Sequence, residues 1–387
     1  MARKLLLASA GAGKSRRIAE KALEHAAAGR KVLLLTYTIN NQGELVKEIC
    51  RLNSCQPENV VVKGWFNFLL EDMIRPYQQC IVPDRISGVL LNPGNPHLVP
   101  GKNYAMKGRS ERLDGKFNPL HFVTPGDNRA HTYYLAKLAA RVHSETKGRA
   151  AHRLAEIYSA IFVDEVQDLV GWDYDIIKAL TETNILEIEC VGDFRQAVYQ
   201  TSETNKLPQD STEKLAQFNN MGFISESLAI SWRCLQAICG IADRLHSQEG
   251  HYLPTMSNVE DVPLQYAGHQ GVFAVPKARL REYIETYRPA ILRWNRSTQK
   301  ELCDGQTAYN FGECKGLGFE RVLILPPAKH AKFLSGDMQA FDGSETDDSR
   351  NKLYVAITRA RYSVAFPYEG GNIIEGAQAW PLENLDP

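Results

Sequence analysis

The sequence predicts an α/β protein with two parallel sheets, each flanked by helices. Short apolar segments alternate with helix-like segments along most of the 387 residues. This alternation is typical of strands joined by crossover helices, which form parallel sheets. The length is enough for two domains, and 44% hydrophobic with 23% charged residues is ordinary for a globular protein.

The first domain is expected to span residues 1–222. Its buried strands are predicted from short apolar runs at 5–8, 31–36, 60–62, 160–163 and 186–191. Helices are predicted at 15–28, where Gly29 ends the helical pattern, and at 41–51.

Residues 71–150 are predicted to be an insertion in this domain. Gly, Pro, Asn and Asp dominate 83–128, whereas 131–157 predicts a helix. Residues 102–153 carry eleven Lys and Arg against four Asp and Glu. The insertion is either a basic surface or a solvated loop and helix face, and both interpretations stay open.

The second domain is expected to span residues 223–387. Strands are predicted at 290–292, 322–325 and 363–366. The chain ends about twenty residues after the last strand, so no appended nuclease domain is expected.

Charge and cysteine usage exclude several classes of protein. The formal net charge is zero, so any nucleic-acid surface must be a local basic patch. The eight cysteines include no Cys-x-x-Cys pair, which argues against a zinc site or a disulfide framework and predicts a reducing, cytoplasmic location. No apolar run is long enough to span a membrane, and the apolar start at 5–8 is too short for a signal peptide.

A phosphate-binding loop is predicted between the first strand and the first helix. Small residues let backbone N–H groups wrap a phosphate at the N-terminus of a helix. Lys14 would reach the β- and γ-phosphates of ATP, and Ser15 would offer its hydroxyl to Mg²⁺. The loop residues are Ser9, Ala10, Gly11, Ala12 and Gly13. An ordinary Gly/Ala turn is the alternative.

Two carboxylates follow the apolar strand at 160–163. Asp164 could hold Mg²⁺ through its water shell, and Glu165 could orient and deprotonate the attacking water. A surface acidic turn would explain neither the pairing nor its place after an apolar run. Together with the loop, these residues predict an ATP site.

Eight segments in order resemble the motifs of UvrD/Rep-type superfamily 1A DNA helicases. The resemblance spans residues 5 to 366, and the segments matching motifs I, II and VI are individually specific. In family order from motif I, the segments are 10–16 (including Arg16), 35–40 (Ia), 64–69 (Ib), 164–168 (II), 191–199 (III), 231–234 (IV), 311–319 (V) and 353–361 (VI).

The resemblance implies two RecA-like P-loop NTPase domains with the ATP site in the cleft between them. It implies that Gln196 senses the γ-phosphate and that Trp232 stacks on adenine. Arg233 and Arg359 would act as arginine fingers, stabilising charge on the transferred phosphoryl group. A surface salt bridge is the alternative for each arginine.

The resemblance also implies a nucleic-acid track. The aromatic candidates for base stacking are Tyr37, Trp65, Phe66 and Tyr199. Thr38, Lys315 and Gly316 are candidates for contacts to the strand's backbone. Core packing is the alternative for the rings, and it is strong for Trp65 and Phe66.

Four departures from the family pattern affect these expectations. No Gln-containing adenine-reading segment is expected upstream of residue 5. Thr201 stands where a base-stacking ring is usual, and Gly318 stands where the family usually has Glu. About fifteen residues separate Leu292–Asn295 from motif V, so the domain known as 2B has no sequence to form it.

The implied activity is a single-stranded-DNA-stimulated ATPase that translocates, or a 3′–5′ DNA helicase acting on tailed DNA, with RNA left open as a track. A different class is also open. The chain could be an ATPase subunit or switch that acts with a partner such as a nuclease, in DNA repair or phage defence. A non-hydrolysing nucleic-acid binder is the third interpretation, against which Lys14 and Glu165 argue.

Overall fold

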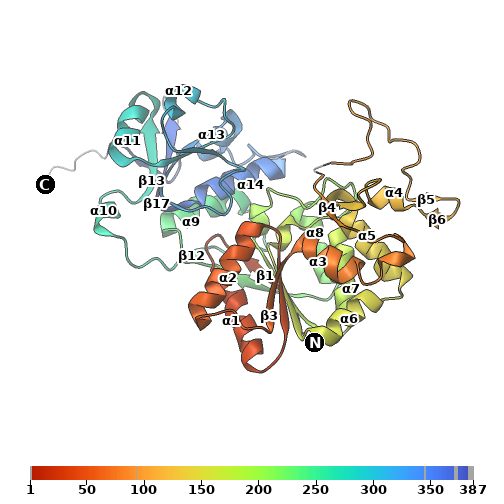
Figure 1. Cartoon of the computed structure of the whole chain (residues 1–387). Helices are drawn as coiled ribbons and strands as arrows, with labels where there is room; N and C mark the ends of the chain where they lie inside the picture. Colours follow the sequence, from red (N-terminus) through yellow and green to blue (C-terminus); the bar gives the residue numbers. More distant parts are fainter. Residues whose placement is uncertain (1, 93, 344–345, 370–373, 382–387) are drawn as a thin grey trace. The chain divides into compact units, whose positions relative to one another are not determined.

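The computed structural model describes residues 2–92, 94–343, 346–369 and 374–381 (Figure 1). The chain separates into two compact units. The first comprises Met1–Leu6, Lys14–Gly192 and Tyr199–Glu226, and the second comprises Leu7–Gly13, Asp193–Val198 and Ser227–Pro387. The short segments Leu7–Gly13 and Asp193–Val198 therefore group with the second unit. The predicted domain boundary at 222/223 stays a prediction.

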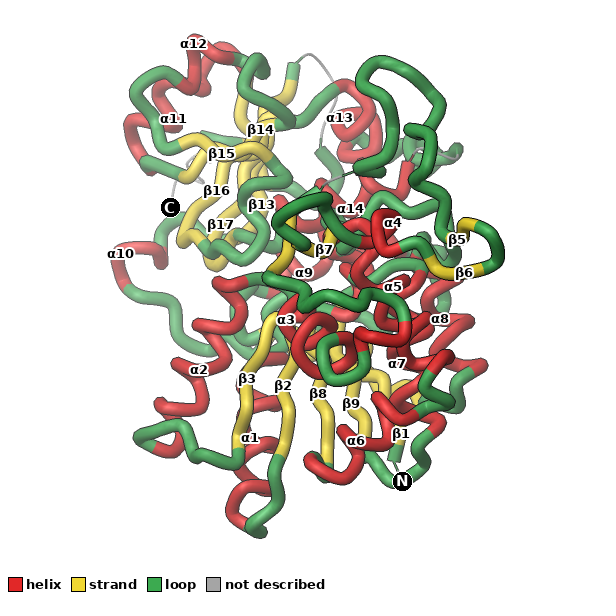
Figure 2. The backbone as a smooth tube through the Cα atoms, turned by 45° about the vertical axis from the view of Figure 1, so that its right-hand side comes forward, coloured by secondary structure: helices red, strands yellow, loops and turns green. Residues whose placement is uncertain are grey.

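The first unit is organised by a six-stranded sheet in the order β10-β1-β9-β8-β2-β3. Neighbouring strands β9, β8, β2 and β3 pair in parallel, and Figure 2 shows them side by side. The strands are β1 (Arg3–Ala8), β2 (Val32–Thr36), β3 (Val60–Gly64), β8 (Ala160–Asp164), β9 (Glu187–Gly192) and β10 (Ile224–Leu228). All five residues of β2 and of β8 are buried, because both faces of a parallel sheet are covered by helices.

Helices and short helical turns connect these strands. They are α1 (Lys14–Ala27), α2 (Ile39–Asn53), α3 (Trp65–Phe68), η1 (Leu69–Ile74), η3 (Val166–Asp168), α7 (Trp172–Glu182) and α8 (Ser211–Asn220), whereas η4 (Phe194–Gln196), which follows β9, groups with the second unit. The start of α2 is fixed by Thr38, whose Oγ1 accepts a hydrogen bond from the N–H of Asn41 at 3.1 Å. The predicted helices at 15–28 and 41–51 therefore form with ends shifted by one or two residues.

The insertion contains two helices where the sequence predicted one over 131–157. Lys147 (φ 51°) and Gly148 (φ 87°) both adopt left-handed conformations, which end the first helix before the second begins. The elements are η2 (Gln78–Cys80), β4 (Gly88–Leu90), β5 (Arg112–Leu113), β6 (Lys116–Phe117), α4 (Pro119–Phe122), β7 (Arg129–His131), α5 (Thr132–Glu145) and α6 (Arg149–Ile157).

Several cations of the insertion are paired with carboxylates. Glu111 accepts contacts from Lys137 at 2.8 Å and from Arg141 at 2.6 Å. Arg153 lies 3.8 Å from Asp72. Exposed lysines remain at Lys102, Lys107 and Lys116. Part of the predicted basic surface is thus neutralised by the fold.

The second unit is organised by a six-stranded sheet in the order β15-β14-β16-β17-β13-β18, in which every neighbouring pair is parallel. Its strands are β13 (Gly271–Pro276), β14 (Ala290–Arg293), β15 (Ala308–Asn310), β16 (Phe319–Leu325), β17 (Ala360–Tyr368) and β18 (Gln378–Ala379). The short strands β11 (Ile230–Ser231) and β12 (Met256–Ser257) form a separate parallel pair. The helical elements are α9 (Gln236–Asp243), η5 (Arg244–His246), α10 (Leu264–Ala267), η6 (Lys277–Arg279), α11 (Leu280–Tyr287), α12 (Lys300–Cys303), α13 (Ala328–Leu334) and α14 (Thr346–Ile357).

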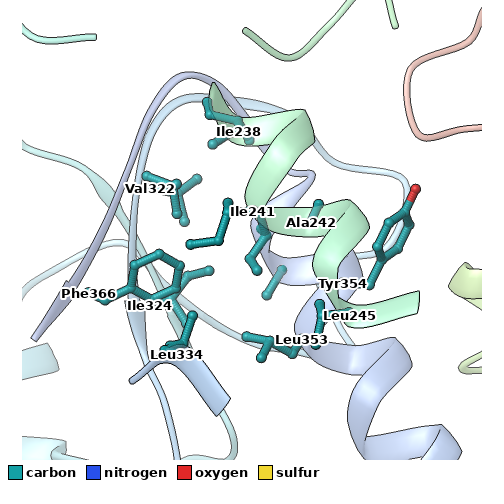
Figure 3. Packing of buried hydrophobic residues seen from close by; sticks show 14 of the residues in the cluster. Ile238, Ile241, Ala242, Leu245, Val322, Ile324, Leu334, Leu353, Tyr354 and Phe366 are labelled. Carbon is teal, nitrogen blue, oxygen red and sulfur yellow. The ribbon is translucent and has the colours of Figure 1, made fainter. Parts of the chain in front are cut away.

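Alternate residues of the central strand β16 supply the two cores of this unit. Val322 and Ile324 pack with residues of α9 and α14, as Figure 3 shows. Leu323 and Leu325 belong to the other cluster, which includes residues of α11. This period of two, inside an uninterrupted apolar run, is that of a strand buried on both faces. The predicted α/β class with two parallel sheets flanked by helices is confirmed.

None of the helices in the described part of the chain has the length and apolar character that a membrane crossing requires.

Candidate active site

The predicted phosphate-binding loop lies between β1 and α1. Gly11 (φ 75°) and Gly13 (φ 73°) occupy left-handed conformations that favour glycine. The N–H of Ala12 donates to the carbonyl of Ser9 at 3.1 Å, which closes the turn. The following helix begins at Lys14, so its unpaired N–H groups lie next to the loop.

Within the first unit, Lys14 contacts Glu165. The Nζ atom of Lys14 lies 3.4 Å from Oε1 of Glu165, and both side chains are largely buried. Glu165 directly follows β8 in a left-handed conformation (φ 56°), and its N–H donates to Oδ1 of Asp164 at 2.9 Å. Gln167 donates a hydrogen bond to the carboxylate of Glu165. The structure therefore brings together the predicted phosphate-binding lysine and both predicted acidic residues.

Asp164 is unusually disposed to hold a proton or a cation. Burial, and next the neighbouring Glu165 carboxylate, raise the pKa of Asp164 to about 7, although Lys14 acts in the opposite direction. A divalent cation would relieve the same unfavourable burial of negative charge. Because Lys14 contacts Glu165, the adjacent Ser15 and Asp164 lie at the same edge of the sheet.

These residues fit Mg²⁺, which typically takes only one or two protein ligands together with phosphates and water. Among the described residues, no cluster of three or more His, Cys, Asp or Glu side chains could hold a metal by itself.

Arg16 lies on the exposed side of α1. Its Nε atom contacts Glu20 at 2.8 Å, one helical turn later, and its side chain is 58% exposed. This placement is the surface ion pair expected at i,i+4 spacing on a helix.

Within the second unit, residues 231–233 contact the phosphate-binding loop. Ser231 Oγ donates to the carbonyl of Ala10 at 2.8 Å, and the N–H of Trp232 donates to the carbonyl of Gly11 at 2.9 Å. A Cβ atom at Gly11 would come within 2.6 Å of Cβ of Arg233. The indole of Trp232 is 64% exposed and therefore available for stacking.

Gln196 and Arg359 are hydrogen-bonded to each other in the second unit. Arg359 Nη2 donates to Oε1 of Gln196 at 3.1 Å, and Gln196 Nε2 donates to Oδ2 of Asp193 at 2.8 Å. The remaining donors of Arg359 reach the carbonyls of Val355 and Leu317 at 3.1 and 3.0 Å. The guanidinium is thus fixed by the protein beside the predicted γ-phosphate sensor.

The nucleic-acid candidates fall into buried and accessible groups. Trp65 is 1% exposed, and its Nε1–H donates to Oδ1 of Asp173 at 2.6 Å, a placement that favours core packing. Tyr37 and Phe66 are half-buried and pack edge to face with ring centroids 5.6 Å apart. Tyr199 is 39% exposed.

The three backbone candidates lie in turns. Thr38 caps helix α2, so its hydroxyl already accepts a hydrogen bond from the protein. Lys315 and Gly316 lie between β15 and β16, and Gly316 (φ 86°) supplies a left-handed conformation there.

Sequence reasoning missed three residues that join these parts. Arg195 and Asp193 are almost completely buried, at 2% and 0% exposed, and Tyr354 is 1% exposed. Their partners are far away in the sequence: Arg195 contacts Asp243 and Ser9, and Tyr354 contacts Asp193. The available signal in the sequence was that Asp193 and Arg195 lie inside the segment resembling motif III, and Tyr354 inside the segment resembling motif VI.

Residues 127–205 match the family described as the UvrD/REP helicase N-terminal domain. This segment of the chain is similar to that family. The match includes the paired carboxylates and the motif III segment, and it confirms the resemblance drawn from the motifs.

Among solved structures, the chain is similar to Arterivirus nonstructural protein 10, a helicase solved in complex with DNA. The TM-score is 0.42 and the identity 13%, over 97% of this chain and 62% of that one. The chain thus spans less than two thirds of the length of that structure. No curated protein matches the chain.

Proposed function

We propose that this protein is an ATPase that is stimulated by single-stranded DNA and uses ATP hydrolysis to move along the strand. The contact between Lys14 and Glu165 carries the proposal. It joins a phosphate-binding lysine to a carboxylate at the end of a buried parallel strand. Open α/β sheets bind ligands at the carboxyl ends of their strands.

Each residue has a proposed role in hydrolysis. The backbone N–H groups of the loop bind the phosphates, and Lys14 turns from Glu165 to the β- and γ-phosphates. The released carboxylate of Glu165 orients the attacking water and accepts its proton. Ser15 and Asp164 would hold Mg²⁺, which supplies charge neutralisation of the phosphates when bound.

Fixed cations stabilise the negative charge that spreads over the transferred phosphoryl group. Arg359 is already oriented by Gln196, which supports its proposed role as an arginine finger. Arg233 lies against the loop at Gly11 and is the second proposed finger. The exposed indole of Trp232 would stack on adenine. The placement of ATP in a cleft between domains stays a prediction.

The proposed track is a single strand whose bases stack on accessible rings. Tyr37, Phe66 and Tyr199 are the proposed stacking residues, because their rings are at least partly accessible. The 3′–5′ direction rests on the family resemblance alone. RNA should be tested beside DNA, because stacking of bases on these rings does not involve the 2′-hydroxyl that distinguishes the two.

Steady-state ATP hydrolysis tests the proposal. Single-stranded DNA should raise kcat of the full chain at least tenfold, and Lys14→Ala should abolish turnover with or without DNA. Lys21→Ala is the matched control, since Lys21 lies on the same helix and pairs with Glu24 on the surface. Hydrolysis that neither DNA nor RNA stimulates would rule the proposal out.

A second candidate function is an ATPase subunit that acts with a protein partner such as a nuclease. One observation favours it: between β14 and β15 the described chain contains only the short helix α12. A compact motor of this kind has little of its own surface with which to grip a duplex. A stoichiometric partner that co-purifies from the native host would support this function, and a lone monomer that unwinds duplex DNA would oppose it.

We also propose a cytoplasmic location. All eight cysteines are free, including the pair Cys234 and Cys239, which lie five residues apart. Free thiols are usual in a reducing compartment.

A further inference from the structure

Arg195 lies at the centre of a buried polar network in the second unit. Its three guanidinium nitrogens reach three different partners. Nε donates to Oδ1 of Asp193 at 3.1 Å, Nη1 donates to Oδ1 of Asp243 at 3.0 Å, and Nη2 donates to Oγ of Ser9 at 2.9 Å. Only a guanidinium can satisfy three such directions at once, because its N–H groups form a fixed planar fork.

The network holds the phosphate-binding loop from two sides. Ser9, which receives the Arg195 hydrogen bond, also accepts one from Oγ1 of Thr255 at 2.9 Å. The next residue, Ala10, donates its N–H to the hydroxyl of Tyr354 at 3.3 Å. The position of the loop therefore depends on side chains from three distant segments.

The same network continues to the predicted catalytic groups. The Tyr354 hydroxyl donates to Oδ2 of Asp193 at 3.2 Å, and this oxygen also accepts from Gln196. Gln196 in turn accepts from Arg359. An unbroken series of hydrogen bonds thus runs from Ser9 through Arg195, Asp193 and Gln196 to Arg359.

Burial makes this network sensitive to any lost partner. The Arg195 side chain is 2% exposed, and its guanidinium lies over the rings of Tyr252 and Tyr354 at 4.8 and 4.7 Å. Two carboxylates, Asp193 and Asp243, balance its charge. In such surroundings a fully satisfied network is rigid, whereas a missing hydrogen bond leaves a buried polar group unpaired.

We propose that Arg195 is a positioning residue that fixes Gln196 and Arg359 relative to the phosphate-binding loop, through Ser9 on one side and Asp193 on the other. The inference rests on the proposed ATP hydrolysis at this loop. Arg195 itself touches neither phosphate nor water in this role. Its effect is to place groups that do.

Arg195→Lys is the informative variant, because it keeps the positive charge between Asp193 and Asp243 but loses the fork. We expect kcat for ATP to fall at least tenfold, while the Kd for ADP changes less than threefold. Arg244→Lys is the matched control, since this arginine of the same unit pairs with Glu375 near the surface, and its kcat should stay within twofold. An unchanged kcat in Arg195→Lys would overturn the proposal.

Ser9→Ala provides a milder break that leaves the buried ion pairs intact. It should also lower kcat, and the double variant Ser9→Ala/Arg195→Lys should be no slower than Arg195→Lys alone, because both remove one connection. Additive losses would contradict a shared role. This variant also decides the matter if Arg195→Lys does not fold.

Hydrogen exchange separates this inference from the proposed function. In Arg195→Lys, backbone amides of Ser9–Gly13 and of Asp193–Val198 should both exchange at least threefold faster. If the native chain hydrolyses no ATP, the proposed function fails and the exchange result still decides the inference. Faster exchange confined to Asp193–Val198 would mean that Arg195 has only a local structural role.

Discussion

Asp164 is the residue whose protonation most directly reports on the candidate site. Its ordinary pKa of 3.8 applies to the unfolded chain, whereas burial and Glu165 raise the pKa in the folded chain to about 7. Between these two pH values the folded state binds more protons at Asp164 than the unfolded state does. The free energy of unfolding therefore falls as pH rises through this range. The buried charge of Asp164 therefore does not lower the free energy of unfolding below pH 3.8, and lowers it by the full amount above pH about 7.

Asp164→Asn should therefore stabilise the nucleotide-free protein increasingly as pH rises. Asparagine carries no charge, so the variant escapes a cost that the native chain meets above about 7. Thermal unfolding in a chelator at pH about 5 and about 8.5 measures the difference, with ~2–4 °C expected for each kcal/mol. Glu58→Gln, at an exposed position, is the control for a lost surface charge. A difference in Tm that is the same at both pH values would contradict the raised pKa.

Residues whose position depends on local sequence could be placed from the sequence, and contacts with distant partners could not. Lys14 and Glu165 were predicted because a strand, a turn and a helix place them through short-range geometry. Trp65 was a weaker candidate for the track, and its Nε1–H contacts Asp173, 108 residues away. Nothing near Trp65 in the sequence encodes that hydrogen bond.

At the level of elements, uninterrupted apolar runs were predicted well and mixed segments were not. The strands at 290–292, 322–325 and 363–366 all formed, each extended by one to five residues in total. β13 (Gly271–Pro276) was missed because glycine and proline at its ends resemble turn signals. β15 (Ala308–Asn310) was missed because its sequence, Ala-Tyr-Asn, is short and ends in asparagine, so it is not an apolar run.

Glu111, in the loop of the insertion, forms ion pairs with two cations of α5. Its carboxylate contacts Lys137 and Arg141, and both cations also lie near the ring of Trp172, at 5.8 and 4.9 Å. These side chains are partly exposed, so solvent screening limits the contribution of the ion pairs to about 1 kcal/mol. These ion pairs therefore hold the loop against α5 but contribute little to the stability of the whole domain.

Glu111→Gln should loosen this loop selectively. A loss of about 1 kcal/mol raises the population of the open loop roughly fivefold. Trypsin should then cleave faster at the exposed Lys102, Lys107 and Lys116, with little change in the overall Tm. Glu145→Gln is the control, because its contact with Arg112 is longer, at 3.8 Å, and more exposed. Equal cleavage rates in the two variants would show that Glu111 does not hold the loop.

For the whole molecule, the zero net charge and the short segment between β14 and β15 limit what the proposed motor can do. The formal net charge is zero, so long-range attraction to DNA is weak and binding depends on local contacts. Residues 294–307 contain only α12 among regular elements, and the described chain offers no large domain there to grip a duplex. Movement along a single strand needs no such domain.

The chain alone should therefore translocate faster than it unwinds. Separating a duplex costs about 1.4 kcal/mol for each base-pair step. A motor that makes no contacts with the duplex must supply this free energy from translocation alone. Stopped-flow fluorescence can compare arrival at the end of a labelled single strand with strand separation of a duplex carrying the same 3′ tail. We expect the step rate on the duplex to be at least tenfold lower, and Lys14→Ala to eliminate both signals. Equal rates on both substrates would show that the compact chain unwinds duplex DNA by itself and needs no partner for it.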